Sequence, residues 1–443
     1  MTPAQILQQY LHKQPQYTFP TVPKPAPDLS IVVVIPCHNE PNLTCVLDAL
    51  RKSPPPSSAA EVWLILNASE QTSASVLEQH RVNQQQLQQW KTQYQQNTSF
   101  SVYWSIHHDL PRKHAGVGLA RKIGMDHACA RLLQAQQETG ILVCLDADCI
   151  VAPSYWKAIE QALAQHPKTN ALSIHYEHPI HHPQHVDTFW QNPETPHAER
   201  ETLRSDLAIV LYELFLRYYV HLQSWAGLPF AFQTVGSAMA VSAQTYAKVG
   251  GMNKRKAGED FYFLQKCIQY GGCHALHTTT VYPSARTSNR VPFGTGRAMH
   301  EILQHDSSPS YTGYDLQSFQ ILKDWLAQRD SWYTSTHQQL QTQFQTWPHL
   351  LQHFLRHVRF LDKISEIQRN VGSIYHFEKR FWTWWDAFMT MKWAHYARDQ
   401  AFPNPHIVQA VQHFLEAAHG VRHIHTPWLQ LQWFRHQDRR DSQ

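Results

Sequence analysis

The sequence is poor in charged residues and has no cysteine pattern typical of a disulfide or zinc protein. Charged residues make up 16% of the 443 residues, and the formal net charge is only +4. Because nucleic-acid-binding proteins usually concentrate positive charge in a stripe, we expect no nucleic-acid partner. The seven cysteines form no Cys-x-x-Cys pair, and most of them lie in apolar runs. We therefore expect reduced thiols in a cytoplasmic protein.

Long apolar runs and a secretion signal are also lacking. No stretch reaches 18 apolar residues, and the nearest one, Leu207 to Val220, is interrupted by Glu213 and Arg217. The first 20 residues do not show the charged-then-apolar layout of a signal peptide. The sequence therefore predicts no transmembrane segment, while peripheral contact with a membrane stays open.

Composition divides the chain into three parts. Residues 1–29 end in a proline-rich stretch, which predicts an extended lead-in. Residues 30–300 alternate apolar runs typical of buried strands with helical segments. This rhythm predicts an α/β domain with a mostly parallel sheet and helices on both faces. In residues 301–443 glycine is rare and apolar residues recur at helical spacing, which predicts a mostly helical C-terminal region.

The residues that follow each expected strand are the first candidates for a binding site. In parallel sheets ligands bind at the carboxyl ends of the strands. The strands are expected at Ile31–Ile35, Val62–Leu66, Phe100–Ile106 and Ile141–Leu145, and the helices between them at Asn42–Lys52, Ser69–Gln96 and Gly118–Gln134.

Two carboxylates follow the last of these strands. Asp146 and Asp148 stand two residues apart, so their side chains point the same way and can bind a hard divalent cation. Such a cation would neutralise a diphosphate as it leaves. Taken alone, the triplet suits a surface turn equally well, because short Asp-x-Asp strings are common.

Three further motifs accompany the Asp pair in a fixed order. Pro36-Cys37-His38-Asn39-Glu40 ends the first strand, and a basic, glycine-rich block covers residues 112–124. Gly258-Glu259-Asp260 opens a helical run. Each motif is weak by itself, but their order carries more information than any one of them.

With these motifs in place, the chain resembles the family 2 glycosyltransferases, which have the GT-A fold. The likeness covers roughly residues 30–300 and implies transfer of a sugar from a nucleotide-sugar to a saccharide or other hydroxyl acceptor. The donor would be a UDP- or GDP-sugar. The matching passages are Val32–Glu40, Lys113–Gly124, Leu145–Asp148, Val235–Met239, Gly250–Met252 and Gly258–Asp260.

The resemblance also implies roles for individual residues. Asp148 would bind Mg²⁺ or Mn²⁺, with Asp146 sharing the metal or lying near the ribose. Asp260 would be the base that deprotonates the acceptor, and Glu259 would bind acceptor hydroxyls or orient that base. The other expected donor-binding residues are Pro36, His38, Asn39, Glu40, Asn67, Arg112, Lys113, Gly116, Gly118, Arg121, Arg286 and Arg290.

Two departures from the family pattern leave alternatives open. The family carries acidic residues after the second strand, where this chain has Asn67, and it usually has Asn at the position of Lys122. The first departure puts the nucleotide base in doubt and keeps a catalytically silent sugar-nucleotide-binding protein as an alternative. Inversion rests on the likeness alone, so a retaining transferase of the mannosylglycerate-synthase type also stays open. A nucleotidyltransferase is a further rival, which the placement of Glu259 and Asp260 fits poorly.

Five histidines fall in the segment His175–His185. Their spacing fits no helix face, and two prolines interrupt the segment. Because a metal site needs a defined ligand geometry, we interpret this segment as an irregular loop and not as a metal centre.

Overall fold

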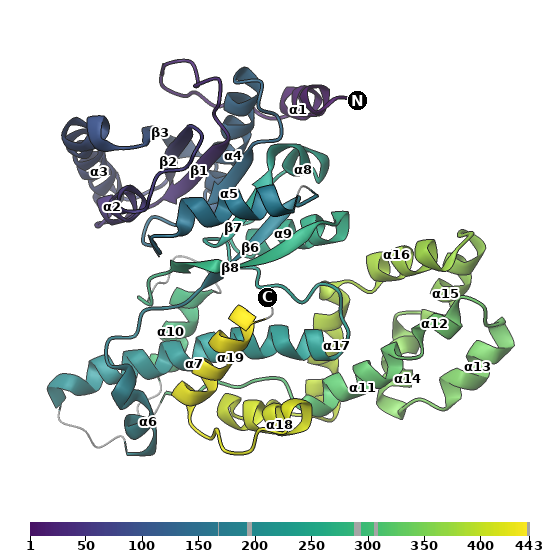
Figure 1. Ribbon diagram of the computed structural model, residues 1–443. Coiled ribbons are helices and arrows are strands. Elements are labelled where there is room, and N and C mark those ends of the chain that lie inside the picture. Colours follow the sequence, from purple (N-terminus) through teal and green to yellow (C-terminus); the bar gives the residue numbers. More distant parts are fainter. Residues whose placement is uncertain (167, 193–196, 288–293, 305–308, 441–443) are drawn as a thin grey trace. The chain divides into compact units, whose positions relative to one another are not determined.

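The structure, a computed structural model, describes all residues except 167, 193–196, 288–293, 305–308 and 441–443 (Figure 1). The chain forms two units. The first, called the sheet unit here, comprises Met1–Pro179, Gln233–His300 and Arg435–Gln443. The second, the helical unit, comprises Ile180–Phe232 and Glu301–Phe434. The boundaries at residues 30 and 300 stay a prediction.

An eight-stranded sheet forms the centre of the sheet unit. Its order is β3-β2-β1-β4-β7-β6-β8-β5. Strands β1 to β4 run parallel, β7 pairs antiparallel with β4 and β6, and β5 pairs antiparallel with β8. This confirms the expected α/β class with a mostly parallel sheet. The strands are β1 Ile31–Cys37, β2 Ala60–Ser69, β3 Phe100–Leu110, β4 Ile141–Cys144, β5 Ile150–Val151, β6 Ala171–Tyr176, β7 Met239–Ser242 and β8 Cys273–Tyr282.

Helices cover both faces of this sheet, as expected. On one face α1, α4, α8 and α9 share a core with alternate residues of β1 and β2. On the other face α5 packs against α2, where Trp156 donates a hydrogen bond to the carbonyl of Leu50 (Figure 1). The helices are α1 Pro3–His12, α2 Thr44–Lys52, α3 Ala74–Tyr94, α4 Val117–Gln134, α5 Tyr155–Gln165, α8 Ala243–Lys248 and α9 Glu259–Tyr270, with a 3-10 turn at Gln95–Asn97.

Helix α4 lies close against the sheet because a glycine faces it. A Cβ at Gly124 would overlap the side chain of Val34 and come within 2.9 Å of that of Ile65. All seven residues of β1 are buried, as the continuous apolar run predicted. The close approach brings the first turn of α4 to the carboxyl ends of the strands.

The helical unit has an aromatic core. The rings of Trp325 and Trp385 lie 4.4 Å apart, and both side chains are buried. Helices α10 (Thr295–Leu303) and α19 (Pro427–Arg440) include residues of both units. The others are α6 Pro183–Gln191, α7 His197–Trp225, α11 Leu316–Leu326, α12 Arg329–Trp332, α13 His337–Gln345, α14 His349–His357, α15 Phe360–Arg369, α16 Ile374–Trp384, α17 Ala387–Gln400 and α18 Ile407–His419.

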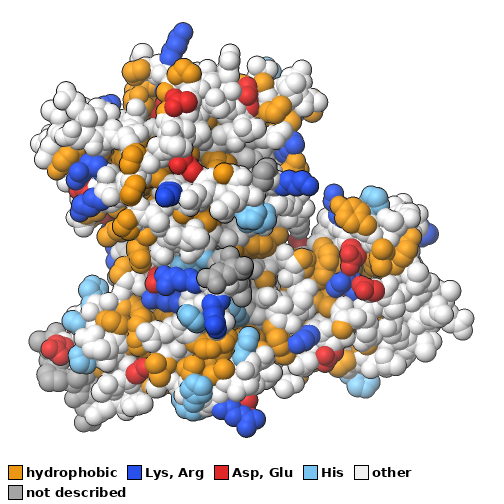
Figure 2. Space-filling view, viewed as in Figure 1, with side chains coloured by type: hydrophobic (Ala, Val, Ile, Leu, Met, Phe, Trp, Pro, Cys, Tyr) orange, Lys and Arg blue, Asp and Glu red, His pale blue; other side chains and the backbone are white. Residues whose placement is uncertain are grey.

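The stretch that comes nearest to a long apolar run, Leu207 to Val220, lies within α7. There Arg217 donates to Glu213 at 2.8 Å, and both side chains are buried. Among the residues that the structure describes, no helix is both long and apolar enough to cross a membrane. On the face in view, Lys and Arg side chains stand singly or in small groups and form no continuous stripe (Figure 2).

Candidate active site

Arg286 joins the carboxyl ends of β1 and β4. Its guanidinium donates to both carboxylate oxygens of Glu40, with Nη1 3.0 Å from Oε1, and its Nη2 lies 3.0 Å from Oδ2 of Asp148. The Glu40 side chain is buried, whereas that of Asp148 is 23% exposed. Hydrogen bonding to Glu40, opposed by burial and helped by Asp148, raises the pKa of Arg286. The structure thus brings three predicted site residues together.

We call an arginine that is paired with two carboxylates a junction; Arg286 forms the first, and Arg121 forms a second that is more deeply buried. It donates through Nη2 to Oδ1 of Asp146 at 2.5 Å and through Nη1 to Glu259. Burial acts to lower the pKa of Arg121, but the two carboxylates outweigh it and raise the pKa further. A Cβ at Gly236 would overlap the guanidinium, so this position needs glycine for Arg121 to reach its partners.

Helix α9 begins at the two carboxylates that the sequence assigns to the acceptor side. Gly258 precedes them with a φ of 69°, in the left-handed region that glycine adopts without strain. Asp260 accepts hydrogen bonds from the backbone N–H of Gly236 at 2.9 Å and of Phe261 at 2.8 Å. Burial raises the pKa of Asp260 and raises that of Glu259 to about 7, against the opposing effect of Arg121. Such carboxyl groups are suited to exchange protons near neutral pH.

Negative charge exceeds positive charge at these two junctions. A bound diphosphate would add to the excess, so the site needs another cation to hold one. In the described part of the chain, no three His, Cys, Asp or Glu side chains form a group that could hold a metal ion. Mg²⁺ is commonly held by one or two carboxylates together with substrate phosphates, and Asp146 and Asp148 fit that arrangement. The two guanidinium groups, of Arg121 and Arg286, pair with four carboxylates, those of Glu40, Asp146, Asp148 and Glu259, and the carboxylate of Asp260 is adjacent to Glu259.

Imidazole and amide groups lie around the carboxyl ends of β1, β2 and β3; Asn67 falls within the last residues of β2 and not after it. His38 Nδ1 lies 2.8 Å from the carbonyl oxygen of Asn67. Asn39 has a φ of 52°, and its N–H donates to His80 Nε2 at 3.4 Å. His80 Nδ1 in turn lies 3.0 Å from His108 Nε2. A chain of imidazole and amide groups therefore borders the region where the sequence predicts the nucleotide base.

The sequence analysis missed the part that α3 plays in this region. His80 is buried, and burial together with His108 and His38 lowers its pKa to about 4. Asn83 donates to the carbonyl of Glu40 at 2.7 Å and thereby fixes the loop after β1. The signal was present, since these two residues continue the helical face of Leu87 and Trp90 toward the N-terminus.

Comparison with known proteins gives a family for part of the chain. Residues 32–206 match the family described as "Glycosyl transferase family 2". These residues form a family 2 glycosyltransferase domain. The expectation of a glycosyltransferase is thereby confirmed at the level of the family. The match includes Arg121 and the Asp pair and ends before α9 and Arg286.

Solved structures give only a distant likeness to the chain. Staphylococcus aureus TarS, residues 1–349, is 12% identical over 78% of this chain and 93% of its own, with a TM-score of 0.37. Its complex with UDP-GlcNAc is 13% identical over 77% and 92%, with a TM-score of 0.38. At these values we draw no conclusion from the likeness. No curated protein matches the chain significantly in sequence.

The glycine-rich block of the family 2 domain lies where α4 begins. Gly116 is the residue before the first turn of α4, and a Cβ there would come 3.1 Å from the Cα of Lys256. A Cβ at Gly118 would overlap the carbonyl oxygen of Arg255. Both glycines therefore let the loop before α9 lie directly on the start of α4.

The other predicted donor-binding residues are less closely connected to the carboxylates. Arg112 and Lys113 are exposed, and no described contact joins them to the two junctions; Arg112 donates to Gln71 at 3.1 Å. Pro36 is buried within β1. Arg290 lies outside the described residues. The donor-binding roles of these four residues stay predictions.

Lys122, where the family usually has Asn, serves the packing of α1. Its ammonium group donates to the hydroxyl of Tyr10 at 2.9 Å and lies 2.9 Å from Asp126. The hydroxyls of Tyr10 and Tyr246 both donate to Asp126, at 2.8 and 2.7 Å. Lys122 is therefore paired with Asp126 in a buried hydrogen-bond network. This network connects α1 and α8 to α4.

The interpretation of the histidine segment as an irregular loop was wrong at both ends. His175 lies in β6, with its Nε2 3.0 Å from Oε1 of Glu177, and His185 lies in α6. Strand pairing and a proline at the helix start account for the regular structure.

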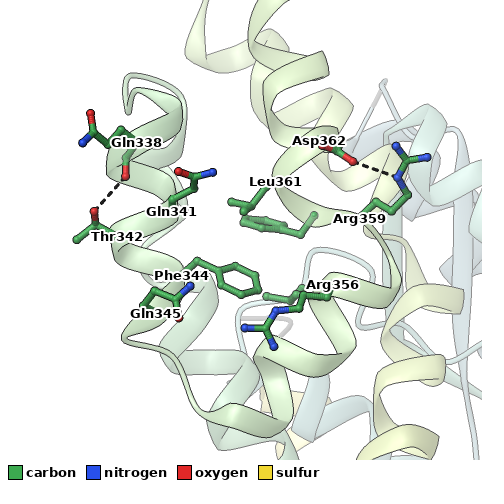
Figure 3. Close-up of a pocket in the computed structure, with 11 residues that line it drawn as sticks. Gln338, Gln341, Thr342, Phe344, Gln345, Arg356, Arg359, Leu361 and Asp362 are labelled. Atoms are coloured by element: carbon green, nitrogen blue, oxygen red, sulfur yellow. Dashed lines mark hydrogen bonds and ion pairs between the residues drawn. The ribbon is translucent and has the colours of Figure 1, made fainter.

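A cavity of about 600 Å³ in the helical unit contains none of the predicted site residues. Gln338, Gln341 and Gln345 of α13 line one side, facing Arg356 and Arg359 (Figure 3). The lining includes one carboxylate, Asp362, which is paired with Arg359 at 3.0 Å. The cavity therefore lacks the groups that glycosyl transfer needs, and we place the candidate active site at the sheet edge.

Proposed function

We propose that the protein transfers a sugar from a nucleotide diphosphate sugar to an acceptor hydroxyl, with inversion and with the help of a divalent cation. One observation carries this proposal: two buried or half-buried arginines pair with four carboxylates that follow β1 and β4 or begin α9, and Asp260 is adjacent to one of the four. The arrangement supplies an anionic pocket for a cation and a pair of carboxyl groups suited to proton transfer.

The donor's diphosphate belongs beside Asp148 and Arg286. Asp148 and Asp146 would hold Mg²⁺ or Mn²⁺, which would neutralise the diphosphate as the sugar leaves it. Arg286 presents a planar fork of donors, which matches phosphate oxygens as well as it matches the carboxylate of Glu40. The nucleotide base, of UDP or GDP, would lie against the imidazole of His38 and the polar groups of Asn39 and Asn67.

Asp260 is the proposed base. It would take the proton from an acceptor hydroxyl as that oxygen bonds to the anomeric carbon and the carbon–oxygen bond to the diphosphate breaks. The N–H groups of Gly236 and Phe261 hold its carboxylate in place, and its raised pKa makes it a stronger base than an exposed aspartate. Glu259, held by Arg121, would orient the acceptor or the base.

A panel of UDP- and GDP-sugars, incubated with the purified protein and Mn²⁺, tests the proposal. We expect slow release of nucleoside diphosphate from one donor, and a rise in melting temperature with that donor, because it binds the folded state. EDTA should abolish both. A donor that binds but releases no diphosphate with any acceptor would favour a catalytically silent binding protein. NMR of the product's anomeric centre would separate inversion from retention.

A further inference from the structure

Five cationic side chains lie in two adjoining loops of the sheet unit. Four of them are exposed and Lys254 is partly exposed. In the described part of the chain, none of the five takes part in an ion pair with a carboxylate. One loop precedes α4 and the other precedes α9. The five residues are Arg112, Lys113, Lys254, Arg255 and Lys256.

The loop before α9, residues 253–257, is fixed in place. Asn253 accepts a hydrogen bond from the N–H of Arg255 at 3.0 Å, and its amide donates to the carbonyl of Glu259 at 3.2 Å. The backbone at Arg255 and Lys256 rests on the glycines at the start of α4. The three cations of this loop are therefore held within a few residues of Glu259 and Asp260.

The positive charge of this loop is not needed to neutralise the diphosphate of the donor. Arg286 and a divalent cation already serve the diphosphate in the proposed site. The guanidinium of Arg255 lies over the ring of Tyr262 at 3.8 Å, which orients it without neutralising it. Neighbouring like charges repel one another, and an anionic ligand relieves that repulsion.

We propose that Lys254, Arg255 and Lys256 bind an acceptor that carries negative charge, namely a saccharide bearing phosphate, sulfate or carboxylate groups. This inference rests on the proposed function, because it assigns the acceptor of the same site. The anionic groups pair with the loop while a hydroxyl of the acceptor faces Asp260.

The composition of the loop favours a saccharide over a membrane surface. Basic sites that bind membranes usually combine cations with exposed apolar or aromatic side chains. The only large apolar residue in residues 250–258 is Met252, which is buried. The loop therefore offers charge without an apolar contact.

Binding of fluorescein-labelled dextran sulfate to the full-length protein, with uncharged fluorescein-dextran as the reference ligand, tests the inference. The loop variant carries Lys254→Gln, Arg255→Gln and Lys256→Gln. The control carries Lys24→Gln, Lys52→Gln and Lys157→Gln, which removes the same charge from exposed residues elsewhere in the sheet unit. Equal melting temperatures show that both variants fold.

Wild type and the control should bind dextran sulfate, with an affinity that falls as salt rises, and the loop variant should bind roughly tenfold more weakly. Equal affinity of wild type and loop variant would overturn the inference. So would equal binding of the uncharged dextran, or binding to phosphatidylglycerol vesicles without binding to dextran sulfate. None of these results depends on turnover, so they are distinct from a failure of the proposed function, which donor hydrolysis by wild type reveals.

Discussion

The guanidinium of Arg286 lies 3.0 Å from the carboxylate of Asp148, the residue that we propose as a metal ligand. The same guanidinium is hydrogen-bonded to buried Glu40. A cation at Asp148 and Arg286 would compete for one carboxylate, and a diphosphate would give Arg286 new oxygen atoms to bind. Metal and donor should therefore bind more tightly together than either does alone.

Asp148→Ala should abolish metal-dependent binding of the donor. Without this carboxylate the cation loses its main protein ligand, and the diphosphate meets a site with excess negative charge. Calorimetry with and without EDTA measures the effect, and the control is Asp109→Ala, an exposed carboxylate with no ion pair in the described residues. Unchanged affinity of Asp148→Ala, with EDTA making no difference in either protein, would contradict the assignment.

Arg121→Gln should destabilise the protein severely. Arg121 is buried between Asp146 and Glu259, and removing one partner of a buried ion pair leaves carboxylates without compensation. We expect a loss of about 3–5 kcal/mol in the free energy of unfolding, measured by urea denaturation. Arg112→Gln, at an exposed position, should change stability by less than roughly 0.5 kcal/mol. Similar unfolding free energies for the two variants would show that the ion pairs of Arg121 contribute little to stability.

Stability should fall as the pH is lowered, because three buried or half-buried histidines are uncharged in the folded protein. Burial lowers the pKa of His80 and of His107 to about 4, and that of His127 to about 3. Each group ionises in the unfolded chain near pH 6.5, so its contribution is complete above about that pH and is lost as the pH falls toward the folded-state pKa.

The melting temperature should therefore drop between about pH 7 and about pH 5. His127→Phe should reduce this drop, since His127 is stacked on Phe19 with ring centroids 3.6 Å apart and an apolar ring can take its place. An identical drop in wild type and variant would show that His127 does not contribute to the acid sensitivity.

Asp260→Asn should slow sugar transfer by roughly 10²–10⁴ while leaving donor affinity intact. The amide oxygen can keep one of the two hydrogen bonds from the backbone N–H groups of Gly236 and Phe261, but the amide cannot take the acceptor's proton. Steady-state rates measure the first effect and donor titration the second. Turnover equal to that of wild type would place the base elsewhere.

Local patterns predicted the edge of the sheet where the candidate site lies. Apolar runs gave β1 and β4, and parallel strands bring Glu40 and Asp148 to the same edge. The local pattern could not show which distant side chains pair with one another at the site. Arg121 and Glu259 are 138 residues apart, and only the packing of α4 against α9 joins them.

Residues that depart from a familiar pattern were harder to interpret. Lys122 appeared as a departure from the family pattern within the basic, glycine-rich block, but its charge is satisfied by Asp126, one helical turn away, and by a tyrosine of α1. His80 was overlooked because the sequence does not show which face of α3 packs against the rest of the fold. A polar residue on the packed face therefore looks the same as one exposed to solvent. The grouping of Ile180–Phe232 with the C-terminal helices likewise depends on tertiary contacts between distant segments.

Diffraction from a crystal grown with Mn²⁺ and the donor identified by the hydrolysis panel tests the central claim most directly. We predict an anomalous manganese peak that shares the Asp148 carboxylate with the donor's diphosphate, with Arg286 turned onto a phosphate oxygen. A donor bound with no manganese at Asp146 or Asp148, or bound away from both residues, would contradict the account.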